Sequence, residues 1–195
     1  MAVQAFKYFT IQAGGTPQPL IGTVLSTAVT AAQAAALSLQ GGLIQNSISL
    51  HVADSSMFIG AQYLSLIDPS TYATESKLRV MAVPDSTHVV VTGLKNAHPG
   101  GAYGTGSWVA LGNNAQQVYV QALDGNTGSL YLGTSAQMVT STGVFVIAKL
   151  MKVGSGVQPY DFSTSRQGLA DAESVSQYWI DGTTSDSYLP SLGLV

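Results

Sequence analysis

Apolar and polar residues alternate along much of this chain, in short runs that are typical of β-strands. In residues 48–53, three aliphatic side chains alternate with Ser, His and Ala, which is the period of two expected of a half-buried strand. Further runs rich in β-branched and aromatic residues are bounded by Gly, Pro, Asn, Asp and Ser, at a spacing of roughly 8–12 residues. The pattern predicts an all-β protein of the sandwich or barrel class. The further runs are residues 5–11, 78–83, 88–92, 118–123, 129–133 and 144–150.

Two loop sequences predict hairpins. Residues 124–128 (DGNTG) separate two strand-like runs, and their two glycines and one asparagine tolerate positive φ. A loop of this length is common in hairpins, so we expect residues 118–123 to pair with residues 129–133. We expect a second hairpin between residues 137–140 and 144–150, across Ser-Thr-Gly.

Residues 12–45 differ from the rest of the chain because no charged residue occurs among them. Pro17 and Pro19 interrupt sheet pairing in this stretch. Residues 28–39 are rich in alanine, and we expect them to form a short helix or an extended segment lying on a neighbouring subunit. We interpret the whole stretch as an arm, or a small subdomain, that contacts another subunit. Removal of residues 1–45 is then expected to leave the C-terminal part of the chain folded.

A domain boundary is predicted near residues 111–115. Five of residues 99–114 are glycine, a density typical of loops and linkers. We therefore predict two small β-sandwich or β-barrel modules, with short connecting loops and at most one short helix. The N-terminal module spans residues 1–111 and includes the arm, and the C-terminal β-sandwich module spans residues 112–195.

Charged residues make up only 9% of the 195 residues, where about 25% is typical of soluble domains. A monomer normally keeps its surface solvated with charged side chains, so we expect copies of the chain or other proteins to cover much of this surface. The seven Lys and Arg residues are scattered and the net charge is −3, which argues against direct binding of nucleic acid. Polar residues interrupt the long apolar stretches, so no membrane span is predicted.

The sequence contains no catalytic or metal-binding motif that we recognise. His51, His88 and His98 have a spacing that matches no metal-ligand motif, so we interpret them as structural or surface residues. Residues 100–106 are rich in glycine but lack the lysine and the following helix of a phosphate-binding loop. The chain has no cysteine and no G-x-S-x-G sequence. We therefore predict that it is not an enzyme and that it needs no metal or cofactor.

The densest aromatic groups are Tyr178-Trp179 and the sequence YDF at residues 160–162. Such side chains suit a carbohydrate platform, but more often they belong to a core or to a subunit contact, because they bring a large area with few rotatable bonds. Together with the aliphatic residues of the arm, they give a set of predicted subunit-contact residues. That set is Leu20, Ile21, Val24, Leu25, Tyr178 and Trp179.

Several segments resemble structural proteins of tailed bacteriophages. In the C-terminal part these are AQQVYVQALDGNTGSLYLGTS, STGVFVIAKL and SVSQYWIDGTTSDSYLPSLGLV. In the middle of the chain they are HVADSSMFIGAQYLSLIDPS and RVMAVPDSTHVVVTGLKNAHPGGAY. The shared pattern is a strand meander with an N-T-G turn, a strand ending in Tyr-Leu-Gly, and a terminal strand pair around Asp-Gly.

The resemblance implies a virion structural protein, made in the cytoplasm of a bacterial host and then built into the phage particle. Within that class we expect a capsid decoration or cement protein that forms a homo-oligomer, for example a trimer, and binds the major capsid protein or other virion proteins. A head–tail connector or tail component is the alternative within the same class. An alternative from another class is a carbohydrate-binding β domain for host attachment.

Overall fold

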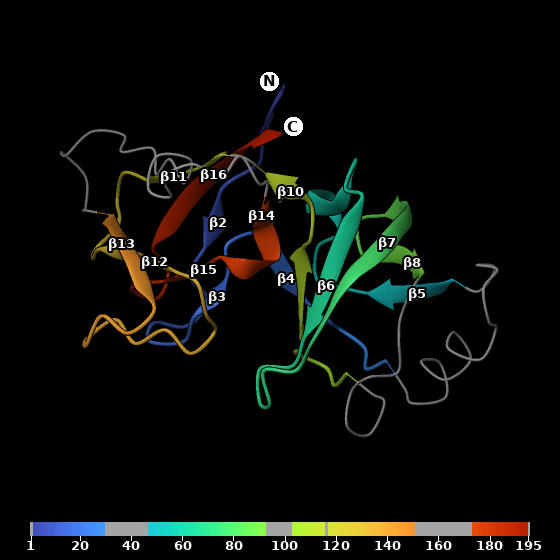
Figure 1. Cartoon of the computed structure of the whole chain (residues 1–195), viewed down its shortest axis with the longest axis horizontal. Helices are drawn as coiled ribbons and strands as arrows, with labels where there is room; N and C mark the ends of the chain where they lie inside the picture. The colour runs from blue at the N-terminus through green and yellow to red at the C-terminus, as the bar shows by residue number, and fades with distance from the viewer. Residues whose placement is uncertain (1, 30–46, 93–102, 116, 151–172, 195) are drawn as a thin grey trace. The chain divides into compact units, whose positions relative to one another are not determined.

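A computed structural model describes residues 2–29, 47–92, 103–115, 117–150 and 173–194 of the chain (Figure 1). Its regular structure consists of β-strands and two short 3-10 turns, η1 (Ser56–Phe58) and η2 (Val175–Gln177), with no α-helix among the described residues. The prediction of an all-β protein is therefore confirmed. The described part of the chain holds no helix with the length and hydropathy needed to cross a bilayer.

The chain divides into two units, but the division is not the one that the sequence suggested. Unit 1 contains Met1–Ile21 and Asn114–Val195, and unit 2 contains Gly22–Asn113. The boundary predicted after residue 111 lies close to the second change of unit. Residues 1–21, however, were assigned to the N-terminal module and instead cluster with the C-terminal residues. In sequence, unit 2 is thus an insertion between two parts of unit 1.

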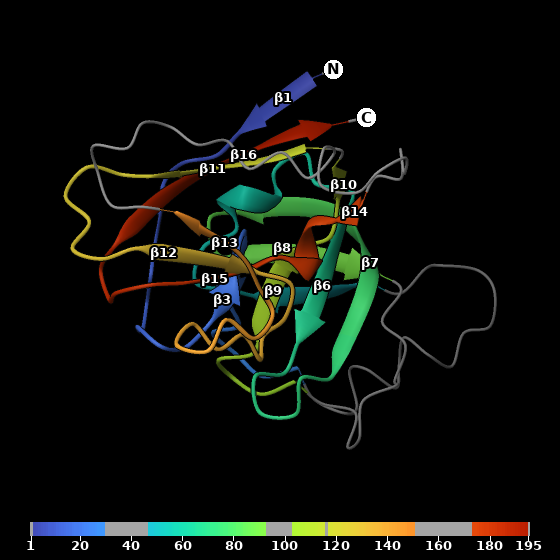
Figure 2. The same ribbon diagram turned by 60° about the vertical axis from the view of Figure 1, so that its left-hand side comes forward.

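The first sheet of unit 1 explains this arrangement. Strand β16 (Ser187–Leu194) pairs with β1 (Ala2–Ala5) and β2 (Phe9–Thr10), and on its other edge with β11 (Gln117–Ala122). All three pairings are antiparallel, and the register joins Ala2 to Leu194. Figure 2 shows β1, β16 and β11 running together, with both chain ends beside them. Backbone hydrogen bonds between the two ends of the chain therefore close unit 1.

The second sheet of unit 1 has the strand order β13-β12-β15-β3. Strand β3 supplies an edge, and its Pro19, which has no amide proton, is tolerated there because an edge strand leaves one side unpaired. A separate pair joins β10 to β14. Side chains from both sheets are buried, among them Val120 and Leu192 from the first and Leu132 and Ile180 from the second. The bounds are β3 Gln18–Pro19, β10 Asn114–Ala115, β12 Leu130–Gly133, β13 Val146–Leu150, β14 Glu173–Ser174 and β15 Trp179–Asp181.

The prediction of a hairpin over residues 118–133 is wrong, although both of its strands are present. Strand β11 pairs with β16, whereas β12 pairs with β13 and β15. The loop between them is bound to β16 instead: the Asn126 side chain donates to the Ser187 carbonyl at 2.9 Å and accepts from the Ser187 amide at 2.7 Å. The Asp186 carboxylate accepts from the amides of Thr127 and Gly128. These long-range bonds make the loop a corner between two sheets.

The second predicted hairpin is present only at its tip. Val139 and Val144 form an isolated antiparallel bridge, and the Gly143 amide donates to the Val139 carbonyl at 2.9 Å. Strand β13, which follows, pairs with β12 and not with residues 137–140. The Ser-Thr-Gly sequence therefore predicted the turn correctly, and competition from β12 decided the rest of the pairing.

Unit 2 is one curled sheet with the strand order β4-β9-β6-β7-β8-β5. Its first and last strands are joined by a bridge between Leu25 and Val52, and the Ser26 amide donates to the His51 carbonyl at 2.8 Å. Leu50 and Val52 are buried while Ser49 and Ala53 are exposed, so the alternation predicted for residues 48–53 is confirmed. The bounds are β4 Gly22–Val24, β5 Ile48–His51, β6 Tyr63–Ile67, β7 Thr74–Asp85, β8 His88–Thr92 and β9 Trp108–Leu111.

Deletion of residues 1–21 is expected to unfold unit 1, contrary to the expectation from the sequence. The deletion removes β1, β2 and β3 together with the buried side chains of Ile11, Leu20 and Ile21. Circular dichroism and limited proteolysis of the truncated chain should show partial loss of strand signal and cleavage within residues 114–195. A truncated chain that resists protease there as the full chain does would contradict this assignment.

Tyr188→Phe is expected to destabilise unit 1 by about 1–3 kcal/mol, because a buried carbonyl loses its partner. Burial raises the pKa of the Tyr188 phenol well above its usual range, so the hydroxyl stays protonated and donates to the Leu20 carbonyl at 3.0 Å. The Gln18 side chain donates to the same hydroxyl at 3.2 Å. Tyr8→Phe is the matched control, because Tyr8 is 64% exposed. Urea unfolding of the two variants should separate them, and equal midpoints would show that these bonds contribute nothing.

Candidate functional site

The predicted subunit-contact residues belong largely to the interior of the chain. Five of the six are at most 5% exposed, and only Val24 keeps part of its surface. A side chain buried within one chain has no surface to offer a neighbour, so the prediction is wrong for these five. The five buried residues are Leu20, Ile21, Leu25, Tyr178 and Trp179.

The arm interpretation changes for the same reason. Within residues 12–45, the described part contains β3 in unit 1 and β4 in unit 2, both of which complete sheets of the chain itself. Val29 forms a bridge with Tyr103 in unit 2. Most of the predicted helix at residues 28–39 lies outside the described residues. Burial within the chain accounts for the absence of charge at residues 18–21, 23, 25 and 29, whereas residues 12–16 and 26–28 are exposed.

A group of exposed apolar side chains in unit 1 lies at the end of the loop before β13, apart from the exposed Tyr8. Val139, Val144 and Phe145, which we call the apolar tip, are 43%, 46% and 50% exposed. The tip is anchored by Met138, which is buried against Gly133 so closely that a Cβ at Gly133 would overlap its sulfur. The tip therefore presents three apolar side chains to solvent from a fixed base.

Phe145 has an unfavourable backbone conformation. Its φ is +57°, in the left-handed region that costs a non-glycine residue about 1–2 kcal/mol. The Phe145 carbonyl accepts from the Thr134 amide at 3.2 Å, and this bond holds the strained residue next to β12. Half of the aromatic side chain remains in solvent, so burial within the chain offsets the strain only in part. Strain of this kind is often retained where an exposed residue has a function.

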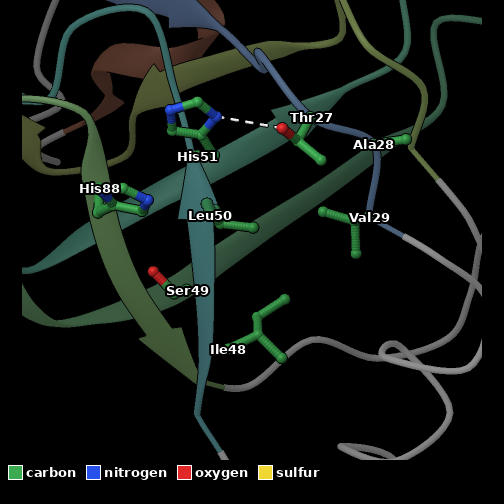
Figure 3. A pocket seen from close by; sticks show the side chains of 8 residues that line it. All are labelled: Thr27, Ala28, Val29, Ile48, Ser49, Leu50, His51 and His88. Carbon is green, nitrogen blue, oxygen red and sulfur yellow. Dashed lines mark hydrogen bonds between the residues drawn. The ribbon is translucent and has the colours of Figure 1, made fainter.

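A pocket of about 240 Å³ lies in unit 2 beside the closing edge of the curled sheet. It is lined by residues 27–29, by residues 48–51 of β5 and by His88 of β8. Figure 3 shows His51 and His88 on neighbouring strands, with the Thr27 hydroxyl beside the His51 ring. The ring centroids are 4.8 Å apart, with an angle of 26° between the planes. His98, the third histidine of the sequence, lies outside the described residues.

Asp85 is hydrogen-bonded to His88 in the turn between β7 and β8. Both carboxylate oxygens lie 2.9 Å from His88 Nδ1, and the Thr87 amide donates to Oδ1 at 2.8 Å. The bond from the Thr87 amide, followed by the bond from His88, lowers the pKa of the Asp85 carboxyl to about 2. Asp85 is therefore ionised over the whole physiological range and acts only as a hydrogen-bond acceptor.

Sequence reasoning missed both the apolar tip and the histidine pair. The run Val144-Phe145-Val146 breaks the alternation expected of a half-buried strand, and this break was the available signal for the tip. Spacing alone gave no signal for His51 and His88, since only the pairing of β5 with β8 brings them together. No group of three or more His, Cys, Asp or Glu side chains suited to a metal ion occurs among the described residues.

Comparison of the chain with protein-family models, with curated proteins and with solved structures found no match. The function therefore has to be argued from the composition of the chain and from the surface features described above.

Asp85→Asn is expected to lower stability at neutral pH, by an amount that shrinks in acid. The pKa of Asp85 falls from an ordinary 3.8 to about 2 in the folded protein, so its ionised form stabilises the fold above pH 3.8 and loses that effect as the pH falls through 2. The effect is small because the side chain is 52% exposed.

Thermal unfolding of wild type and variant at pH 7, 4 and 2.5 measures this difference. Asp124→Asn, which makes the same charge change at another exposed aspartate, is the control. A difference in unfolding temperature that stays constant from pH 7 to pH 2.5 would exclude the carboxylate as its source.

Proposed function

We propose that this protein is a structural subunit of a tailed-bacteriophage particle, acting as a capsid decoration or cement protein. The observation that carries the proposal is the apolar tip on a chain of very low charge. Exposed apolar side chains held by a rigid base suit a protein–protein contact, and only 9% of the residues are charged. The resemblance of residues 115–195 and of the middle of the chain to phage structural proteins supports the same class.

The role would be mechanical. Neutral polar and apolar surfaces associate without the cost of desolvating ions that charged interfaces carry. A homo-oligomer seated on contacts of the major capsid protein would add many such small interactions across the head. Each would raise the barrier to release of capsid subunits. The strained Phe145 fits this role, because burial of its ring against a partner would repay the backbone cost only in the assembled particle.

The carbohydrate-binding alternative receives less support from the described residues. Tyr178 and Trp179, the proposed sugar platform, are buried, and Trp108 is also less than a tenth exposed. None of these rings offers a face to a sugar. The other aromatic cluster, at residues 160–162, lies outside the described residues.

A triple substitution of the apolar tip tests the proposal. Val139→Ser, Val144→Thr and Phe145→Asn together remove exposed apolar area, and Asn tolerates the left-handed backbone of residue 145. We expect self-association in light scattering and incorporation into phage particles to fall at least tenfold. The unfolding temperature should change little, because these side chains are half-exposed.

The matched control is Ile59→Thr with Met81→Gln, which removes exposed apolar area from unit 2 instead. It should assemble like wild type. Quantitative mass spectrometry of purified particles distinguishes the members of the class, because a decoration protein follows the stoichiometry of the capsid lattice and a connector that of one ring. Absence of the protein from purified particles would overturn the proposal. If the tip variant assembled as fully as wild type, the apolar tip would not be the contact surface.

A further inference from the structure

His51 and His88 are direct cross-strand partners. The register of β5 and β8 places them opposite each other, and the Val52 amide donates to the Thr87 carbonyl at 2.8 Å in the adjacent pair. Because hydrogen-bonded and non-hydrogen-bonded pairs alternate along an antiparallel ladder, the histidines occupy a non-hydrogen-bonded pair. The two side chains of a non-hydrogen-bonded pair lie closer together than those of a hydrogen-bonded pair, which accounts for the stacked rings.

Hydrogen bonds orient both rings through the same nitrogen. His88 Nδ1 must donate to Asp85, since an ionised carboxylate only accepts. His51 Nδ1 lies 3.1 Å from the Thr27 hydroxyl. Within the described residues, Nε2 of neither ring has a hydrogen-bond partner. Histidines that bind metals usually have this arrangement, with one ring nitrogen bonded to an oxygen of the protein and the other left for the metal.

We propose that His51 and His88 form a binding site for a divalent transition-metal ion, with Zn²⁺, Ni²⁺ and Cu²⁺ as the matching class. Imidazole nitrogen suits these ions and not Mg²⁺ or Ca²⁺, which prefer oxygen ligands. The site is independent of the proposed role in a phage particle. Sequence spacing predicted no metal site, because the two ligands lie on strands that only the fold pairs.

The distance between the rings fits chelation. A bond of about 2.0–2.1 Å from each nitrogen to the metal places each ring centroid roughly 3.2 Å from the ion. With a nitrogen–metal–nitrogen angle of about 90–110°, the two centroids then lie about 4.5–5.2 Å apart. The observed separation is 4.8 Å. Because the ring planes are stacked at 26°, both rings have to turn about Cβ–Cγ, which is a broad torsion, to point Nε2 at one ion. The same turn shifts each Nδ1 relative to Asp85 and Thr27.

The surroundings supply the remaining requirements of such a site. His88 is 38% exposed and both rings line the pocket, so an ion has access from solvent and water has room to complete the coordination. The negative charge of Asp85, bonded to the far side of the His88 ring, makes that ring a better ligand.

Calorimetric titration of the full chain with Zn²⁺ tests the proposal, with Ni²⁺ as a second probe. We expect one ion per chain, and an unfolding temperature that rises by roughly 3–6 °C at an ion concentration ten times the dissociation constant. His51→Gln and His88→Gln should each weaken binding at least tenfold. Asp85→Asn leaves both ligands in place and should weaken binding severalfold.

His98→Gln is the matched control, because it removes the one other histidine of the chain and should leave binding unchanged. Circular dichroism of each variant establishes that it is folded, and Asp85→Asn provides a reading if a histidine variant fails to fold. No heat of binding for either ion would overturn the proposal. So would binding that survives in folded His51→Gln and His88→Gln, or binding that is lost in His98→Gln. None of these results depends on whether the protein occurs in phage particles.

Discussion

The pairing of β16 with strands from both sequence segments of unit 1 is the interaction on which the rest of that unit depends. The last strand of the chain receives β1 and β2 on one edge and β11 on the other. It also carries Tyr188, whose hydroxyl is bonded to the Leu20 carbonyl next to the second sheet. Because β16 follows unit 2 in the sequence, unit 1 cannot complete its core until the inserted unit 2 and residues 187–194 have been made. Contacts this distant in sequence form slowly.

Buried aspartates that accept hydrogen bonds from backbone amides take much of the structural role that ion pairs have in other proteins. Asp186 accepts from the amides of Thr127 and Gly128, and Asp181 accepts from those of Gly15 and Gly182. Both aspartates are almost completely buried. A carboxylate that accepts several amide bonds stabilises a turn without a cation. A chain with few lysines and arginines can therefore fix its loops through aspartate and leave its outer surface largely neutral.

Two surface features differ in kind from this framework. The apolar tip retains backbone strain at Phe145 and exposes three apolar side chains, which favours a protein partner. The histidine pair lies at the junction that closes unit 2, where the His51 carbonyl accepts from the Ser26 amide of the strand segment opposite. An ion held there would link β5 to β8 beside the junction of β4 and β5. The apolar tip concerns assembly and the histidine pair concerns local stability, so the two are tested by separate experiments.

The sequence by itself determined the all-β class, the positions of strands such as β5, β8, β11, β12 and β13, and the turn at residues 141–143, because alternation and turn residues act over a few positions. It did not predict β6 and β9, two strands in the middle of the unit 2 sheet. It also predicted a boundary near residues 111–115, close to the change of unit after Asn113, but gave no sign of the change after Ile21. Only the tertiary structure decided which strands pair: residues 124–128 have the composition of a hairpin loop, yet Asn126 binds Ser187, which is 61 residues away. Likewise, apolar residues such as Leu20 and Trp179 suit a core or a subunit contact equally well, and only their burial identified the core. The meeting of His51 with His88 depends on strand register, which no local pattern encodes.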